Sequence, residues 1–279
     1  MKLIMTLVVR DEADILETQL RYHRVQGVDF FLVLDHRSLD NTREQLTAYE
    51  DKGWLKWFAI DQLQRDQGRW VTALAQRAYR DYGADWVINN DADEFWWVSQ
   101  GNLKSYLAAV PTAYRLVYAP RVNFWAPNDQ PAEANAPFWK TMCLQQATPL
   151  NFLGEPLSGK ICHRGEANIE VHHGNHSVAP MQPEDIAPPQ AETALKILHF
   201  PIRNYPQFEQ KIRNGGGSWV ANPHLSEQVG KAKRQLYSDY LTGKLPNFYR
   251  QWQARHNANN AVHNTTFRDF MEKINQELT

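Results

Sequence analysis

The sequence predicts an α/β fold: a Rossmann-like, mostly parallel sheet with helices on both faces, followed by a mixed segment and a helical C-terminal part. Two observations predict it. Short apolar runs alternate with helical patterns over residues 1–95, and each of the first three helical patterns stops at a glycine. Alternating strands and helices are typical of βαβ units, whose parallel sheet is covered on both faces.

The first 95 residues supply four strands and three helices. The predicted strands are apolar runs bounded by polar residues: 2–9, 30–34, 55–60 and a fourth that begins at 86–88. A run that is apolar throughout suits a strand buried on both faces. The predicted helices place apolar residues near helical spacing and stop at Gly27, Gly53 and Gly83: 13–26, 43–52 and 70–82.

The regular alternation of strands and helices ends near residue 100. A short helix is expected at 103–109 and a strand at 114–119. Shorter strand-like pieces follow at 140–144, 160–163 and 169–172. Helical patterns then dominate to the end, at 206–213, 226–241, 247–256 and 266–278. We therefore divide the chain into an α/β half at 1–120, a mixed segment at 121–200, and a helical region at 201–279 that packs on the same domain.

Composition excludes several classes of protein. The 279 residues include 30 Lys and Arg against 31 Asp and Glu, and this near balance argues against general nucleic-acid binding. No apolar run reaches the roughly 18–20 residues of a membrane helix. Two cysteines provide neither a disulfide framework nor a cysteine-based zinc site. We expect a cytoplasmic protein without an integral membrane span. Its C-terminal region, which is rich in basic and aromatic residues, is compatible with peripheral membrane contact.

Polar, acid-rich clusters follow three of the predicted strands. They are Arg10-Asp11-Glu12 after the first, 35–42 after the second, and Asp91-Ala92-Asp93-Glu94 after the fourth. In open parallel sheets, ligands bind outside the carboxyl ends of the strands. Carboxylates spaced as Asp-x-Asp at such an end offer hard oxygen ligands, which suit Mn²⁺ or Mg²⁺ and leave positions open for phosphate oxygens.

These clusters resemble a known family when they are taken in order. The series LVVRDEADIL, VLDHRSLDNT and INNDADEF is similar to glycosyltransferase family 2, in particular to its small bacterial branch related to family 92. The resemblance covers residues 2–97 and thins over 100–155. The stretches 174–176 (GNH) and 198–216 (LHFPIRNYPQFEQKIRNGG) also resemble later segments of that branch.

The resemblance implies a GT-A fold that holds a nucleotide-diphosphate sugar, of the UDP or GDP type, at the carboxyl edge of the sheet. It places Asp35 near the nucleobase and Asp91 at the ribose or a metal-bound water. Asp93 matches the principal metal ligand, and His199 a late histidine near the metal or diphosphate. Arg10 and Glu12 belong to the same nucleotide side. Family 2 often has Asp-Asp-Gly at residues 35–37, where this chain has Asp-His-Arg, so the base contact differs.

Cations are expected around the departing diphosphate, because its negative charge grows as the anomeric bond breaks. Lys211, near the glycines 215–217, is one candidate, and the polar face of a helix is its equal alternative. Arg65, Asp66 and Arg69 precede or open the third helix, where anions bind well. A plain helix start capped by Asp66 is as good an interpretation.

The catalytic base is less sharply defined. Five of the ten histidines lie between 163 and 199, among several carboxylates, and this density marks 163–199 as the acceptor side. We take His176 and Glu170, together with Asp93, as the candidate catalytic residues. The adjacent pair 172–173 points to opposite sides of a strand, and no His-Glu-x-x-His spacing indicates zinc.

The leading hypothesis is therefore a metal-dependent glycosyltransferase that passes a sugar to a hydroxyl of a carbohydrate or glycoconjugate, with inversion expected from the family likeness. An Asp-x-Asp phosphoryl transferase is one alternative, but that class carries its aspartates after the first strand. A non-catalytic carbohydrate-binding protein is another, and the ten tryptophans suit it. The alternating βα pattern counts against that all-β class of protein.

Overall fold

The computed structural model describes residues 1–62, 66–127, 136–146, 148–151, 154–220, 231–258 and 261–277. Two compact units divide the chain. Unit 1 comprises Met1–Asp61, Asp66–Arg121 and Ser158–Leu198, and unit 2 comprises Gln62–Arg65, Val122–Leu157 and His199–Thr279. The strand-end clusters at 10–12, 35–42 and 91–94 all belong to unit 1.

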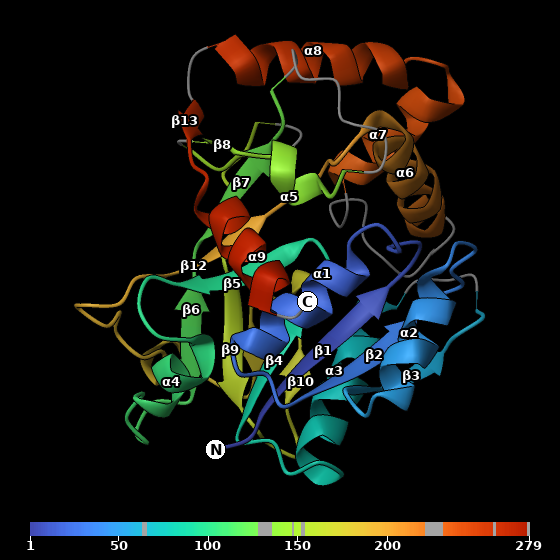
Figure 1. Ribbon diagram of the computed structural model, residues 1–279. Coiled ribbons are helices and arrows are strands. Elements are labelled where there is room, and N and C mark those ends of the chain that lie inside the picture. The colour runs from blue at the N-terminus through green and yellow to red at the C-terminus, as the bar shows by residue number, and fades with distance from the viewer. Residues whose placement is uncertain are drawn as a thin grey trace. The chain divides into compact units, whose positions relative to one another are not determined.

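A six-stranded sheet forms the centre of unit 1, in the order β3-β2-β1-β4-β9-β6 (Figure 1). The strands are β1 (Leu3–Val9), β2 (Phe30–Asp35), β3 (Leu55–Ala59), β4 (Trp86–Asn90), β6 (Leu116–Ala119) and β9 (Lys160–Arg164). The first four are parallel, whereas β9 runs antiparallel to both β4 and β6. Because β9 is reversed, it begins at the edge of the sheet where β4 ends.

Helices cover both faces of this sheet, which confirms the predicted α/β fold class. Side chains alternate along β1, so Ile4 and Met5 point to opposite faces. Ile4 joins a buried cluster with Trp70 and Leu74 of α3 (Gln67–Arg80). Met5 faces α1 (Leu16–Val25), whose Gln19 donates a hydrogen bond to its sulfur. The remaining helix of this half, α2 (Thr42–Asp51), packs beside β3.

Strand register brings the acidic strand ends to one edge. Asp35 of β2 lies level with Val9, and Asn90 of β4 lies level with Leu7. Neighbouring strands are about 4.8 Å apart, and β2 and β4 flank β1, so residues 35 and 91 begin roughly 10 Å from each other. One nucleotide-sized ligand can span that separation.

Smaller elements complete unit 1. The hairpin of β10 (Glu170–Val171) and β11 (Val178–Ala179) encloses the short helix η1 (His173–Asn175) and hydrogen-bonds to α3 through Thr72 and Gln76. Strand β12 (Leu195–His199) lies beside β5 (Glu94–Val98). The other small helices are α4 (Leu103–Ala108) and η2 (Pro183–Asp185).

Unit 2 combines a small antiparallel sheet with helices. Its strands follow the order β13 (Ala261–His263), β8 (Leu144–Gln146) and β7 (Arg121–Trp125). Its helices are α5 (Phe138–Thr141), α6 (Tyr205–Val220), α7 (Lys231–Leu241), α8 (Leu245–Ala258) and α9 (Thr266–Glu277). Helices α6, α7 and α8 share a buried cluster that includes Phe208, Ile212 and Leu236.

Two expectations about helices need correction. The third helix begins at Gln67 rather than at residue 70, because Asp66 caps its first turn by accepting from the Arg69 backbone. The helix expected at 206–213 continues as α6 to Val220, so the glycines 215–217 lie inside it. A Cβ at Gly216 would lie 2.4 Å from Cβ of Tyr237 on α7, so close helix packing explains glycine there. Among the described residues, no helix is long and apolar enough to cross a membrane.

Candidate active site

The loops that follow β1 and β2 are locked together by their own polar groups. The Asp11 carboxylate accepts from the backbone of Leu39 at 2.6 Å, and the backbone of Asp11 donates to Oγ of Ser38. Asp40 accepts from the backbone of Ala13 and from both donors of Thr42. Asp11 and Asp40 therefore brace the edge of the sheet from within.

Asp35 lies at the floor of these loops. Its carboxylate is fully buried. It accepts hydrogen bonds from Nε of Arg43 at 2.6 Å and from the backbone N–H of Ser38 at 3.3 Å. A buried carboxylate is stable in its charged form only when it is paired in this way. His36, where family 2 often has aspartate, packs its ring 4.7 Å from that of Trp70. The departure noted in the sequence is thus a packing contact with α3.

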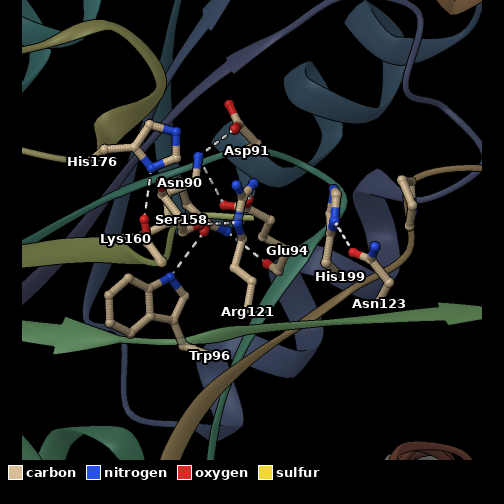
Figure 2. Close-up of polar contacts among 12 residues, drawn as sticks. Asn90, Asp91, Glu94, Trp96, Arg121, Asn123, Ser158, Lys160, His176 and His199 are labelled. Atoms are coloured by element: carbon tan, nitrogen blue, oxygen red, sulfur yellow. Dashed lines mark hydrogen bonds and ion pairs between the residues drawn. The ribbon is translucent and has the colours of Figure 1, made fainter. Parts of the chain in front are cut away.

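The cluster after β4 has a tight geometry of its own. Asn90 donates to the backbone oxygen of Glu94 and accepts from the indole of Trp96, so the chain turns sharply after the strand (Figure 2). Asp91 remains about a third exposed, Asp93 is 4% exposed, and Glu94 is fully buried. Trp96 is fully buried, so it packs in the core.

Two basic residues from distant parts of the chain meet these carboxylates. Lys160, the first residue of β9, places Nζ 2.6 Å from Oδ2 of Asp91 and 3.2 Å from Oε2 of Glu94 (Figure 2). Arg121 places Nη1 3.0 Å from Oε1 of Glu94. From the start of α3, Gln67 donates to Oδ1 of Asp91 at 3.2 Å. Asp91 thus accepts hydrogen bonds at both carboxylate oxygens.

The segment before β9 is held in place from three sides. Nε of Arg121 donates to the carbonyl of Ser158 at 2.7 Å, and the hydroxyl of Tyr118 accepts from the backbone of Gly159. The Gly159 carbonyl lies 2.6 Å from Nδ1 of His176. Since a carbonyl only accepts, Nδ1 carries the proton and Nε2 presents its lone pair. The ring of His176 is therefore oriented by the same residue that precedes Lys160.

Burial and nearby charges determine the protonation states of Lys160 and His176. Burial lowers the pKa of Lys160, but the carboxylates of Asp91 and Glu94 outweigh it, and the net direction is upward. For His176, burial lowers the pKa and the nearby Lys160 ammonium lowers it further. At neutral pH the lysine is charged and the histidine is neutral.

The other predicted residues of unit 1 lie around this edge or away from it. Arg10 is half-buried, and its Nε lies 3.9 Å from Oδ2 of Asp11. The backbone N–H of Glu12 donates to Oγ1 of Thr42. Asp66 caps α3, and Arg69 is exposed in its first turn. Glu170 is exposed on β10. Arg65 lies outside the described residues.

His199 and Lys211 belong to unit 2. Nδ1 of His199 lies 2.8 Å from Oδ1 of Asn123, and Lys211 of α6 contacts the carbonyl of Pro201. No cluster of three His, Cys, Asp or Glu suited to a metal occurs within the described residues. The predicted metal set of Asp91, Asp93 and His199 stays a prediction.

Comparison with known proteins identifies the family. The family model for glycosyltransferase family 92 matches residues 5–275. The chain belongs to glycosyltransferase family 92. It is therefore an enzyme that transfers glycosyl groups, as predicted. The family 92 part of the resemblance seen in the sequence is confirmed, and membership of family 2 stays a prediction. No curated protein matches this family 92 chain in sequence.

Solved structures also show likeness to this glycosyltransferase. The S. aureus TarS fragment 1-349 is 15% identical over 86% of this chain and 71% of its own, with a TM-score of 0.43, and it was also solved with UDP and with UDP-GlcNAc. Glucosyl-3-phosphoglycerate synthase from Mycobacterium tuberculosis, solved with Mn²⁺ and UDP, is 18% identical over 43% of this chain and 44% of its own, with a TM-score of 0.31. The assignment rests on the family match alone.

Sequence reasoning missed the basic half of the cluster. Lys160 and Arg121 lie 69 and 30 positions from Asp91 along the chain, and neither belongs to a motif. One signal was present for Lys160, since it opens the predicted strand 160–163 directly before the apolar Ile161 and Cys162. Strand direction decides that it meets Asp91, and the sequence does not reveal that β9 is antiparallel.

Proposed function

We propose that this family 92 enzyme transfers a sugar from a nucleotide-diphosphate donor, of the UDP or GDP type, to a hydroxyl of a carbohydrate or glycoconjugate. The observation that carries the proposal is the charged cluster of Asp91, Asp93, Glu94, Lys160 and Arg121 at the carboxyl edge of a parallel sheet. Such an edge is where α/β sheets bind nucleotides. Fixed cations there oppose the charge that develops on a departing diphosphate.

The nucleoside end of the donor is proposed to lie over the β1 and β2 loops. Asp35 is held by Arg43 at the floor of these loops, and Asp11 fixes the loop above it. These groups do not need to reorganise when a ligand binds, because each already has a partner. Preorganised polar groups lose less free energy on binding than mobile ones.

His176 is proposed as the base that takes the proton of the acceptor hydroxyl. Its Nδ1 is committed to the Gly159 carbonyl, so Nε2 is the atom that can accept a proton. Its lowered pKa keeps the ring neutral at physiological pH, which a general base requires. A single displacement with such a base inverts the anomeric configuration. Glu170 is exposed on the outer hairpin and lacks a comparable setting.

The divalent ion expected from the sequence fits these residues poorly. Both oxygens of Asp91 already accept hydrogen bonds, from Lys160 and Gln67. Mg²⁺ and Mn²⁺ favour several oxygen ligands, and no group of three His, Cys, Asp or Glu suited to a metal occurs within the described residues. The proposed mechanism therefore takes no step through a metal.

Calorimetric titration with UDP, GDP and CDP tests the donor assignment. We expect one nucleotide to bind. Asp35→Ala should weaken this binding by on the order of 1–3 kcal/mol, because Arg43 and the Ser38 backbone lose the charged hydrogen-bonding group that holds this loop. Asp81→Ala is the matched control, since Asp81 pairs with Arg77 at the far end of α3. If none of the three nucleotides binds, with or without Mn²⁺, the proposal fails.

A pH profile tests the base. We expect His176→Gln to lower kcat by roughly 10²–10⁴-fold with little change in KM for the donor, because the base acts on the acceptor proton. The acidic limb of the wild-type profile should also disappear. A variant that keeps both the rate and that limb would exclude His176 as the base.

A further inference from the structure

The lysine in the carboxylate cluster is placed where a metal was expected. Lys160 is 1% exposed, and its ammonium lies within hydrogen-bonding distance of Asp91 and Glu94. A lysine is rarely buried so deeply unless it is paired. It stays there because two carboxylates meet it on an edge that otherwise favours negative charge.

Two of the three carboxylates in this cluster are balanced by cations in direct contact. Asp91 and Glu94 contribute two negative charges, and Lys160 and Arg121 contribute two positive charges that pair with them. Asp93, which is 4% exposed, adds a third negative charge. A divalent ion bound to Oδ2 of Asp91 at about 2.1 Å would lie within roughly 5 Å of the ammonium. Like charges at that distance repel strongly in a buried site, so ion and lysine compete for one carboxylate.

The backbone around Lys160 leaves it little freedom to withdraw. A Cβ at Gly159 would lie 2.3 Å from the Ala119 carbonyl oxygen, so the two backbones are in close contact. Arg121 fixes the Ser158 carbonyl, and Lys160 itself pairs with Ala119 in the sheet. The ammonium is thus a fixed charge rather than a mobile one.

A second positive feature lies beside it. Helix α3 is 14 residues long, and Gln67 in its first turn touches Asp91. The amino end of a helix carries partial positive charge, which favours phosphate. One N–H group of this end, that of Arg69, already donates to Asp66. A diphosphate at this edge would meet the helix end and the cluster together.

We propose that Lys160 is the resident cation of the donor site, balancing Asp91 and Glu94 so that a nucleoside diphosphate binds without a divalent metal ion. This inference rests on the proposed function, since it presumes that the edge binds a nucleotide. Lys160 acts here as a charge-balancing and positioning residue. Its removal should free Asp91 as a ligand and so create a dependence on metal that the wild type lacks.

The test is titration of the wild type with UDP and GDP, in EDTA and in Mn²⁺. For the nucleotide that binds, we expect the two dissociation constants to agree within about threefold. In Lys160→Met, binding in EDTA should weaken at least tenfold, and Mn²⁺ should restore part of it. Lys160→Arg, which keeps the charge, should remain insensitive to metal.

Lys104→Met is the control, because Lys104 forms an equally short ion pair with Asp29, 2.6 Å long and one-third exposed, at the opposite edge of the sheet. It should behave as the wild type does. Wild-type binding that requires Mn²⁺ would overturn the inference while leaving the proposed function intact. Absence of nucleotide binding under both conditions would overturn the two together. If Lys160→Met does not fold, the comparison of wild-type binding in EDTA and in Mn²⁺ still tests the inference.

Discussion

Gly159 offers a test of how the site is held, through the substitution Gly159→Ala. The added Cβ would lie 2.3 Å from the Ala119 carbonyl oxygen and 2.6 Å from Cζ of Tyr118. An ordinary contact begins at 3.4 Å, so the backbone must retreat by 3.4 − 2.3 = 1.1 Å. Because Ala119 is backbone in a paired strand, most of this movement falls on the segment that carries Lys160 and orients His176.

Gly159→Ala should lower both the stability of the protein and its turnover rate. Overpacking of this kind costs about 1–3 kcal/mol of unfolding free energy, and each kcal/mol lowers Tm by roughly 2–4 °C in a chain of this size. A misplacement of about 1 Å at a reacting group can reduce the rate by on the order of 100-fold. Thermal denaturation followed by circular dichroism measures the first effect, and nucleotide release from UDP- and GDP-sugars measures the second.

The control adds the same methyl group where space is available. At Gly215, inside α6, the nearest heavy atom to a new Cβ is 3.9 Å away. Gly215→Ala should keep Tm or raise it, because alanine favours a helix over glycine by up to about 1 kcal/mol. Gly159→Ala with wild-type Tm and turnover would show that the close contact with Ala119 does not position the site.

Three further predictions concern stability. His23 and His163 are buried with pKa values lowered from 6.5 to about 3 and about 4, burial being the main cause. As the pH falls, these histidines are protonated in the unfolded chain before they are in the folded chain. The unfolding free energy therefore keeps their full contribution above pH ~6.5 and falls by on the order of 2–3 kcal/mol per histidine at pH ~4.5. Urea midpoints that do not decrease between pH 7 and pH 4.5 would contradict this. Glu94→Ala leaves the largely buried Arg121 without its carboxylate and Lys160 with Asp91 alone, and it should cost about 3–5 kcal/mol in urea unfolding. A loss below ~1 kcal/mol would be inconsistent with this expectation. Gly216→Ala would press on Tyr237 of α7 at 2.4 Å and should lower Tm, opposite in sign to Gly215→Ala; equal melting of the two variants would argue against close α6–α7 packing.

Local patterns determined the elements of the first half. The apolar runs at 2–9 and 30–34 became β1 and β2, and the glycines 27, 53 and 83 all adopt positive φ after their helices. These features depend on neighbours in sequence, so a sequence reveals them. The glycines 215–217 show the limit, because only the tertiary contact between Gly216 and Tyr237 explains why residue 216, inside a helix, is glycine.

The carboxylates of the candidate site were visible in the sequence, and their partners were not. Asp35, Asp91 and Asp93 follow strands, and that position is a local property. Arg43 lies only eight residues from Asp35, yet pairing requires the turn between them to fold back. The pairing of Asp91 with Gln67 requires α3 to begin three residues earlier than its apolar pattern suggested.

By itself the sequence determined the α/β class, the family resemblance and the edge of the sheet at which chemistry is expected, since each depends on residue type and short spacing. Tertiary structure alone decided that Lys160 neutralises Asp91 and that Gly159 orients His176. The physical reason is the reversed direction of β9, which brings a buried cation from 69 positions away to the end of β4. Long-range charge pairing of this kind follows from strand direction, and no local pattern encodes it.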